Sequence, residues 1–161
     1  MKRVLSLALA CAVILPFAAR AQGKTDFSGT WTLDAAKSDA PMGRGGRGGG
    51  RGGGAPAGPI TITQTAGDLT QKRGEQTLTY KLDGSESKNQ VQGRGGMQDV
   101  ASKAHWDGAK LIIETTRDLG GMSITTKETR SLSADGKEMT VETAVSTPQG
   151  DINNKQVFTK S

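Results

Sequence analysis

Apolar and polar residues alternate along almost the whole chain after Pro59. A period of two residues is typical of a β-strand with one buried face, because successive side chains point to opposite sides. Short segments containing Gly, Asp or Pro separate the alternating runs. Together with an earlier run, the pattern predicts about ten strands, near residues 27–34, 60–65, 69–73, 76–82, 86–92, 98–106, 109–117, 122–132, 137–146 and 151–159.

Asp-Gly pairs at 83–84, 107–108 and 135–136 mark turns between these strands. Glycine reaches positive φ without steric strain, and Asp-Gly between alternating runs is a strong hairpin signal. Many threonines and few helix formers also favour strands. We therefore expect an all-β fold, an antiparallel up-and-down meander that closes into a barrel of about 8–10 strands. A β-sandwich is the alternative that short, evenly spaced strands also allow.

The turn at 107–108 predicts a register for its hairpin. If Asp107 and Gly108 form the loop, Trp106 faces Ala109, and the same pairing continued leads to Gln98 opposite Arg117. The inner face of this hairpin is then apolar beside the turn and polar at its far end.

Other strands carry a similar mixture of polar and apolar residues on one face. Glu128 and Arg130 share a face with Ile124 and Leu132, and Gln71 and Arg73 share one with Leu69. A dry core rarely accepts so many polar groups, since each needs a partner. Either the barrel encloses water or an amphipathic ligand, or a bulge shifts the register and these groups face solvent.

For the first interpretation, an inward arginine suits a carboxylate headgroup. The alternative is that Arg130 and Glu128 only satisfy each other. The ligand-binding candidates are Arg117, Arg130, Glu128, Gln98, Asn154 and Gln156.

The first 21 residues have the pattern of a secretory signal peptide. A basic start at Lys2-Arg3 is followed by an apolar stretch over 4–19 and by Ala19-Arg20-Ala21, which fits a cleavage site. We expect export to the periplasm or beyond, no transmembrane segment in the mature chain, and one domain over 22–161. The alternatives are attachment of lipid at Cys11, the only cysteine, and retention of the segment without cleavage.

A Gly/Arg-rich tract over 43–58 interrupts the alternating pattern and predicts a disordered loop after the first strand. The formal charge falls from +5 to +2 without Lys2, Arg3 and Arg20, and then to −1 without Arg44, Arg47 and Arg51 of the tract. The positive net charge thus comes from the expected signal peptide and the Gly/Arg-rich loop. Arg-Gly-Gly repeats resemble RNA-binding segments, but export and the lack of aromatic residues in the tract argue against a nucleic-acid partner. The tract contacts anionic envelope surfaces or merely keeps the loop soluble.

Catalytic chemistry has little support in this sequence. His105 is the only histidine, and no serine lies in a nucleophile elbow. One histidine and no mature cysteine give no recognisable metal-ligand set, and we expect no metal or cofactor. The sequence therefore predicts a non-enzymatic protein.

The segment Phe27-Ser28-Gly29-Thr30-Trp31 resembles the G-x-W signature on the first strand of calycins, the lipocalin and fatty-acid-binding-like barrels. The segments 103–113 and 128–137 resemble hairpins of bacterial secreted lipocalin-like proteins.

The resemblance implies a barrel over about 26–160 that binds a small amphipathic or lipid-like molecule. It also implies that Trp31 packs across one barrel end against a basic residue from a late strand, for which Arg130 is the candidate. The chain departs from the pattern in its Gly-rich tract, which replaces the helical lid of fatty-acid-binding proteins. The competing hypothesis is an envelope interaction module with no internal ligand.

Overall fold

The computed structural model describes residues 24–40, 58–93, 96–118, 123–147 and 150–161. These residues form ten β-strands and no helix. Every predicted strand is present, with ends that differ by a few residues. The strands are β1 (Gly29–Leu33), β2 (Ile60–Gln64), β3 (Asp68–Arg73), β4 (Gln76–Lys81), β5 (Glu86–Gly93), β6 (Gly96–Asp107), β7 (Lys110–Asp118), β8 (Ser123–Leu132), β9 (Glu138–Thr147) and β10 (Gly150–Lys160).

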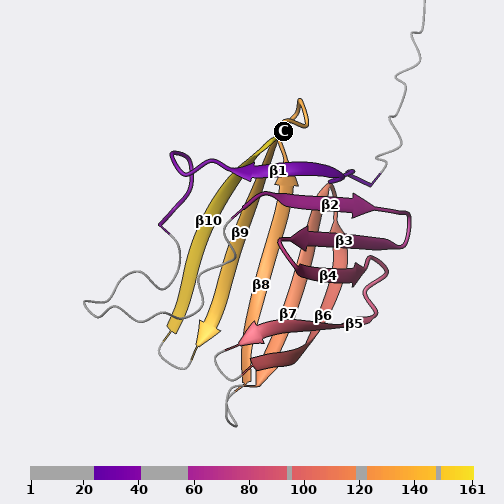
Figure 1. The fold of residues 1–161 in the computed structure, drawn as a ribbon, viewed down its shortest axis with the longest axis vertical. Coiled ribbons are helices and arrows are strands. Elements are labelled where there is room, and N and C mark those ends of the chain that lie inside the picture. Colours follow the sequence, from indigo (N-terminus) through magenta and orange to yellow (C-terminus); the bar gives the residue numbers. More distant parts are fainter. Residues whose placement is uncertain (1–23, 41–57, 94–95, 119–122, 148–149) are drawn as a thin grey trace, which may run out of the picture.

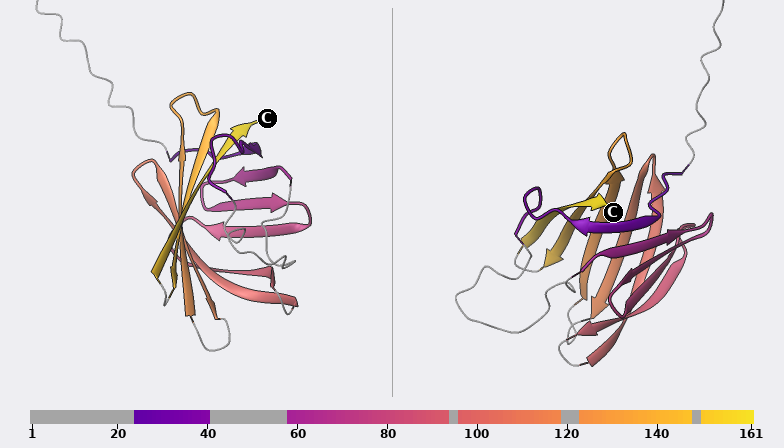
Figure 2. Two further views of the ribbon diagram at one scale, coloured as in Figure 1. Left: turned by 90° about the vertical axis from the view of Figure 1, so that its left-hand side faces the viewer. Right: turned by 45° about the horizontal axis from the view of Figure 1, so that its top comes forward.

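The strands form one antiparallel sheet in the order β4-β3-β2-β1-β10-β9-β8-β7-β6-β5. β1 pairs with both β2 and β10, so the first strand joins the last and the meander curls back on itself. The long strands β6–β10 form one layer, and β1–β5 cross it (Figure 1). Figure 2 shows the same two layers from the side. This nearly closed barrel confirms the predicted fold class.

The barrel has a seam between β4 and β5, where side chains replace the backbone ladder. Asn89 Oδ1 accepts a hydrogen bond from Thr79 N at 2.8 Å, and its Nδ2 donates to Thr79 O at 2.9 Å. Beside it, Lys81 N donates to Ser87 Oγ at 2.8 Å. Asn89 and Ser87 are both buried, so the two side chains provide the hydrogen bonds that a neighbouring strand would otherwise supply.

The Asp-Gly turns confirm the predicted chain reversals. Gly84, Gly108 and Gly136 have φ of 85°, 59° and 68°, which glycine adopts without strain. The register predicted at the second turn was wrong by two residues, because the loop is Gly108-Ala109 and Trp106 pairs with Leu111. A two-residue loop that begins with glycine is itself a favoured hairpin. A shift of two leaves every side chain on its predicted face.

Trp31 closes one end of the barrel. Its indole is fully buried, and Nε1 donates to the carbonyl oxygen of Phe27 at 2.9 Å. Gln64 fixes the segment before β1, because its Oε1 accepts from Phe27 N and its Nε2 donates to Thr25 O. Phe27 also stacks on Trp106, with ring centres 6.1 Å apart, so aromatic side chains fill this end.

The basic residue over Trp31 is Lys160, and the prediction of Arg130 was wrong. Lys160 Nζ lies 5.3 Å from the centre of the indole ring. Gly29 makes room for it, because a Cβ at this position would lie 2.5 Å from Lys160 Cε. The glycine of the G-x-W segment thus allows a cation from the last strand to lie on the tryptophan.

The interior is apolar at the Trp31 end and polar farther along the strands. Arg130 and Ser102 are each 2% exposed, so these polar side chains point into the barrel and not to solvent. The apolar cluster consists of Phe27, Trp31, Ile60, Ile62, Leu69, Tyr80, Leu82, Ala104, Leu111, Ile113, Met139, Val141 and Phe158.

Candidate functional site

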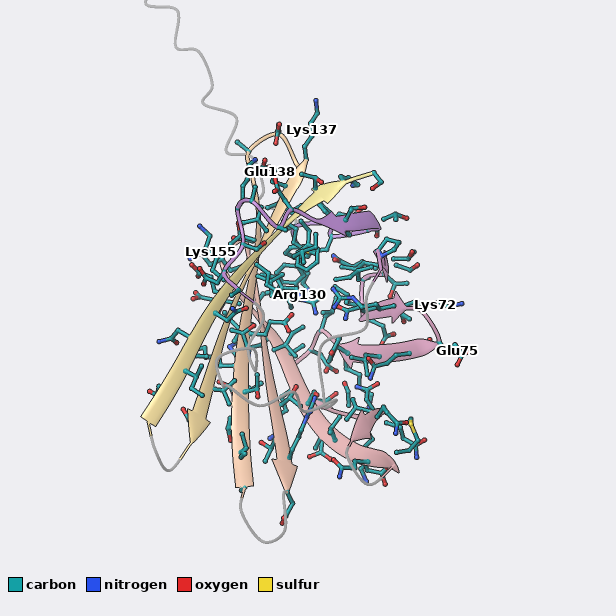
Figure 3. The ribbon with its side chains drawn as sticks, turned by 60° about the vertical axis from the view of Figure 1, so that its left-hand side comes forward. Lys72, Glu75, Arg130, Lys137, Glu138 and Lys155 are labelled. Carbon is teal, nitrogen blue, oxygen red and sulfur yellow. The ribbon has the colours of Figure 1, made fainter. Side chains whose placement is uncertain are left out.

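Arg130 is at the centre of the polar interior. On β8 it lies between Leu111 of β7 and Val141 of β9, and the alternation of the three strands turns all three side chains inward. Figure 3 shows Arg130 between the two layers of the barrel, whereas Lys155 lies on the outside. A guanidinium at this depth needs partners that replace its water.

Two side chains accept hydrogen bonds from the guanidinium of Arg130. Arg130 Nε donates to Glu128 Oε1 in an ion pair, and one of its Nη atoms donates to Gln71 Oε1 at 2.7 Å. The guanidinium also lies 5.9 Å from the centre of the Tyr80 ring. Its other terminal nitrogen, Nη1, is buried and has no hydrogen-bond partner among the described residues. Glu128 and Arg130 do satisfy each other in part, but one donor remains unused.

Arg73 is a second interior arginine, on β3 across the barrel from β8. Its guanidinium lies 5.7 Å from the centre of the Phe158 ring, and its Nε is likewise buried without a partner in the described structure. Burial lowers the pKa of Arg73, while Glu128 acts to raise it and Arg130 to lower it. These influences place Arg73, Glu128 and Arg130 within one electrostatic cluster, in which two cations share one carboxylate.

Tyr80 completes this cluster from β4. It is the only tyrosine of the chain and is 6% exposed. Burial raises the pKa of Tyr80 to about 12, with Arg130 acting against the rise and Glu128 adding to it. The phenol is therefore neutral at physiological pH and available as a hydrogen-bond donor.

A groove of about 670 Å³ lies beside the β4–β5 seam. We call it the seam groove. It is lined by residues 73–77 together with Gln90, Gln92 and Met97. Arg73 therefore belongs both to the interior cluster and to this groove.

A second groove, of about 380 Å³, lies mainly on the outer face of β8–β10. Outward residues such as Lys127, Glu142 and Lys155 line it, and Asp39 lies at its edge. Beneath this groove, β8 is paired with β9 and β9 with β10 without a break in the hydrogen-bonded register. It is therefore a surface feature, separated from the arginine cluster by paired strands.

The other predicted binding residues have different environments. Asn154 is buried and donates through Nδ2 to Ala40 O at 3.0 Å, which fastens the segment after β1. Gln98 and Gln156 are half-buried at inward positions of β6 and β10. Arg117 is exposed near the end of β7, although its charge acts against the rise in the pKa of Tyr80 that burial causes. The structure thus brings together Glu128 and Arg130 and leaves Arg117 at the rim.

Gln71, Arg73 and Tyr80 belong to the site but were not predicted as binding residues. The alternation in the sequence did place Gln71 and Arg73 on the same face as Leu69. The structure has the same alternation in β3, where Leu69 is buried. What the pattern did not contain is the closure of the barrel, which carries β3 opposite β8.

The expected signal peptide and its cleavage site at 19–21 lie outside the described residues, and so do Arg44, Arg47 and Arg51. Of the tract over 43–58, only Gly58 is described. The described residues contain no group of three or more His, Cys, Asp or Glu side chains arranged to hold a metal ion. They also form no apolar helix of the length that crossing a bilayer requires.

No protein-family model matches the sequence, and no curated protein matches it.

Proposed function

We propose that this protein is an exported lipocalin-like barrel that binds a small amphipathic or lipid-like molecule and catalyses no reaction. The observation that carries the proposal is the unused Nη1 donor of Arg130, in an interior where two arginines face one carboxylate. An unpaired buried donor is unfavourable until a ligand accepts from it.

The chemistry of the interior selects an anionic headgroup. A carboxylate accepts strong, charge-assisted hydrogen bonds from a guanidinium. The apolar side chains of Leu111 and Val141 flank Arg130 on the neighbouring strands and give a hydrocarbon tail an apolar surface to lie against. The two parts of the interior thus match the two parts of an amphipathic acid.

The test compares cis-parinaric acid, a fluorescent long-chain carboxylic acid, with its methyl ester. We expect the acid to bind with saturation at one molecule per protein, and the ester to bind at least tenfold more weakly. About 1.4 kcal/mol corresponds to tenfold in affinity, and a hydrogen bond to a charged group contributes roughly 1.5–3 kcal/mol.

Arg130→Met should remove the preference for the acid over the ester. Lys127→Met is the matched control, because Lys127 is an exposed cation on the same strand. Far-UV circular dichroism of both variants checks that the fold is retained. Failure of the wild-type protein to bind the acid, or equal affinity for acid and ester, would overturn the proposal.

A further inference from the structure

The seam groove is lined by residues from both faces of the barrel wall. Arg73 and Gln76, which pair in the β3–β4 ladder, hold inward positions of their strands. Thr77 and Gln90, which line the same groove, hold outward and exposed positions. Residues from both faces therefore line one space.

An opening of this kind requires a break in the sheet, and the break is present. β4 and β5 are neighbours in the barrel, but among the described residues no backbone ladder joins them. The hydrogen bonds between them come from the side chains of Asn89 and Ser87, neither of which lines the groove. Elsewhere the wall consists of paired strands, whose spacing of about 4.8 Å leaves no passage for a hydrocarbon chain.

The charges along the seam groove favour an anion moving inward. Arg73 is at its inner end, close enough to Glu128 and Arg130 to feel both charges. Among the described residues of the lining, the one carboxylate is Glu75, which lies on the outer rim of the β3–β4 turn, away from Arg130 (Figure 3). The walls between them are neutral amides, a hydroxyl and the exposed Met97.

From this arrangement we propose that the seam groove is the route by which the ligand reaches the interior, and that Arg73 binds the anionic headgroup before Arg130 does. This inference rests on the proposed binding function. It makes Arg73 a residue that sets the rate of uptake, whereas Arg130 sets the affinity.

The route is tested by blocking the groove reversibly in a Cys11→Ser background. The thiolate of Gln76→Cys attacks the disulfide of 5,5′-dithiobis(2-nitrobenzoate), which forms a mixed disulfide on the protein and releases one 5-thio-2-nitrobenzoate. The uptake of cis-parinaric acid is then followed by stopped-flow fluorescence. We expect association at least tenfold slower than in the unmodified variant, with full recovery after dithiothreitol. Thr77→Cys, at an exposed position of the same groove, provides a second blocked variant. Thr125→Cys, exposed on β8 outside the groove, is the matched control and should show no change.

Arg73→Gln tests the role of the arginine. We expect a several-fold lower association rate, a weaker dependence of that rate on salt, and a smaller loss of affinity than in Arg130→Met. Unchanged uptake by both blocked variants would overturn the route while leaving the binding function intact. If the wild-type protein itself binds no acid, both the route and the function fail.

Discussion

Tyr80 offers a direct measurement of how dry the centre of the barrel is. It is the only tyrosine of the 161 residues, so phenolate absorbance at 295 nm reports this side chain alone. Burial raises the pKa of Tyr80 from 10.0 to about 12. A fully hydrated phenol would ionise near pH 10.

The shift also predicts how stability depends on pH. Between pH 10 and 12 the unfolded chain loses the phenol proton while the folded chain keeps it, so the unfolded state binds fewer protons and stability falls as pH rises. The contribution is fully present below about pH 10 and is lost through about pH 12. Two pKa units at about 1.36 kcal/mol each correspond to roughly 3 kcal/mol. This is a large part of the roughly 5–15 kcal/mol that stabilises a typical domain.

The assay is a rapid pH jump with absorbance at 295 nm, run beside far-UV circular dichroism at the same pH. Native protein should give a midpoint near pH 12, and protein in concentrated urea should give one near pH 10. Tyr80→Phe should abolish the signal in both. A native midpoint near pH 10, at a pH where the dichroism is still that of the folded protein, would show that Tyr80 is hydrated and that the centre of the barrel is not dry.

Three further predictions concern stability and are measured by urea unfolding. Gly29→Ala should destabilise the fold by about 1–3 kcal/mol, because its φ is +138° and the new Cβ meets Lys160, and adding Lys160→Ala should restore only the steric part. Asn89→Ala should cost about 1–3 kcal/mol and speed amide exchange at Thr79, since the seam loses both hydrogen bonds; unchanged exchange would contradict this. Trp31→Phe keeps an aromatic ring but removes the indole donor, and should destabilise the fold by about 1 kcal/mol.

The strands and their faces were predictable because they depend on local chemistry. Alternation needs only the sequence, and the three Asp-Gly pairs mark reversals that depend on a glycine with positive φ. The register at Gly108 was not predictable to the residue, since Asp107-Gly108 and Gly108-Ala109 are both plausible two-residue loops. The predicted faces survived because the error was an even number of residues.

The contacts that build the site depend on closure of the barrel, which no local pattern contains. Lys160 reaches Trp31 because the last strand pairs with the first, and Arg73 enters the Arg130 cluster because β3 lies across from β8. Arg117 shows that a correctly predicted face does not ensure burial. Alternation places it on the inner face, but it is exposed near the end of β7, since alternation predicts a face and not a depth along the barrel.

The phenol titration also locates charge within the cluster, and this gives the last prediction. Glu128 acts to raise the pKa of Tyr80, and Arg130 acts to lower it. Glu128→Gln removes one negative charge at nearly constant shape, so the native midpoint of Tyr80 should move below that of the wild-type protein. Saturating carboxylic acid places a new negative charge beside Arg130 and should move the midpoint of this variant back up, whereas the methyl ester should not. A midpoint that rises in Glu128→Gln, or that responds equally to acid and ester, would contradict a headgroup held at Arg130.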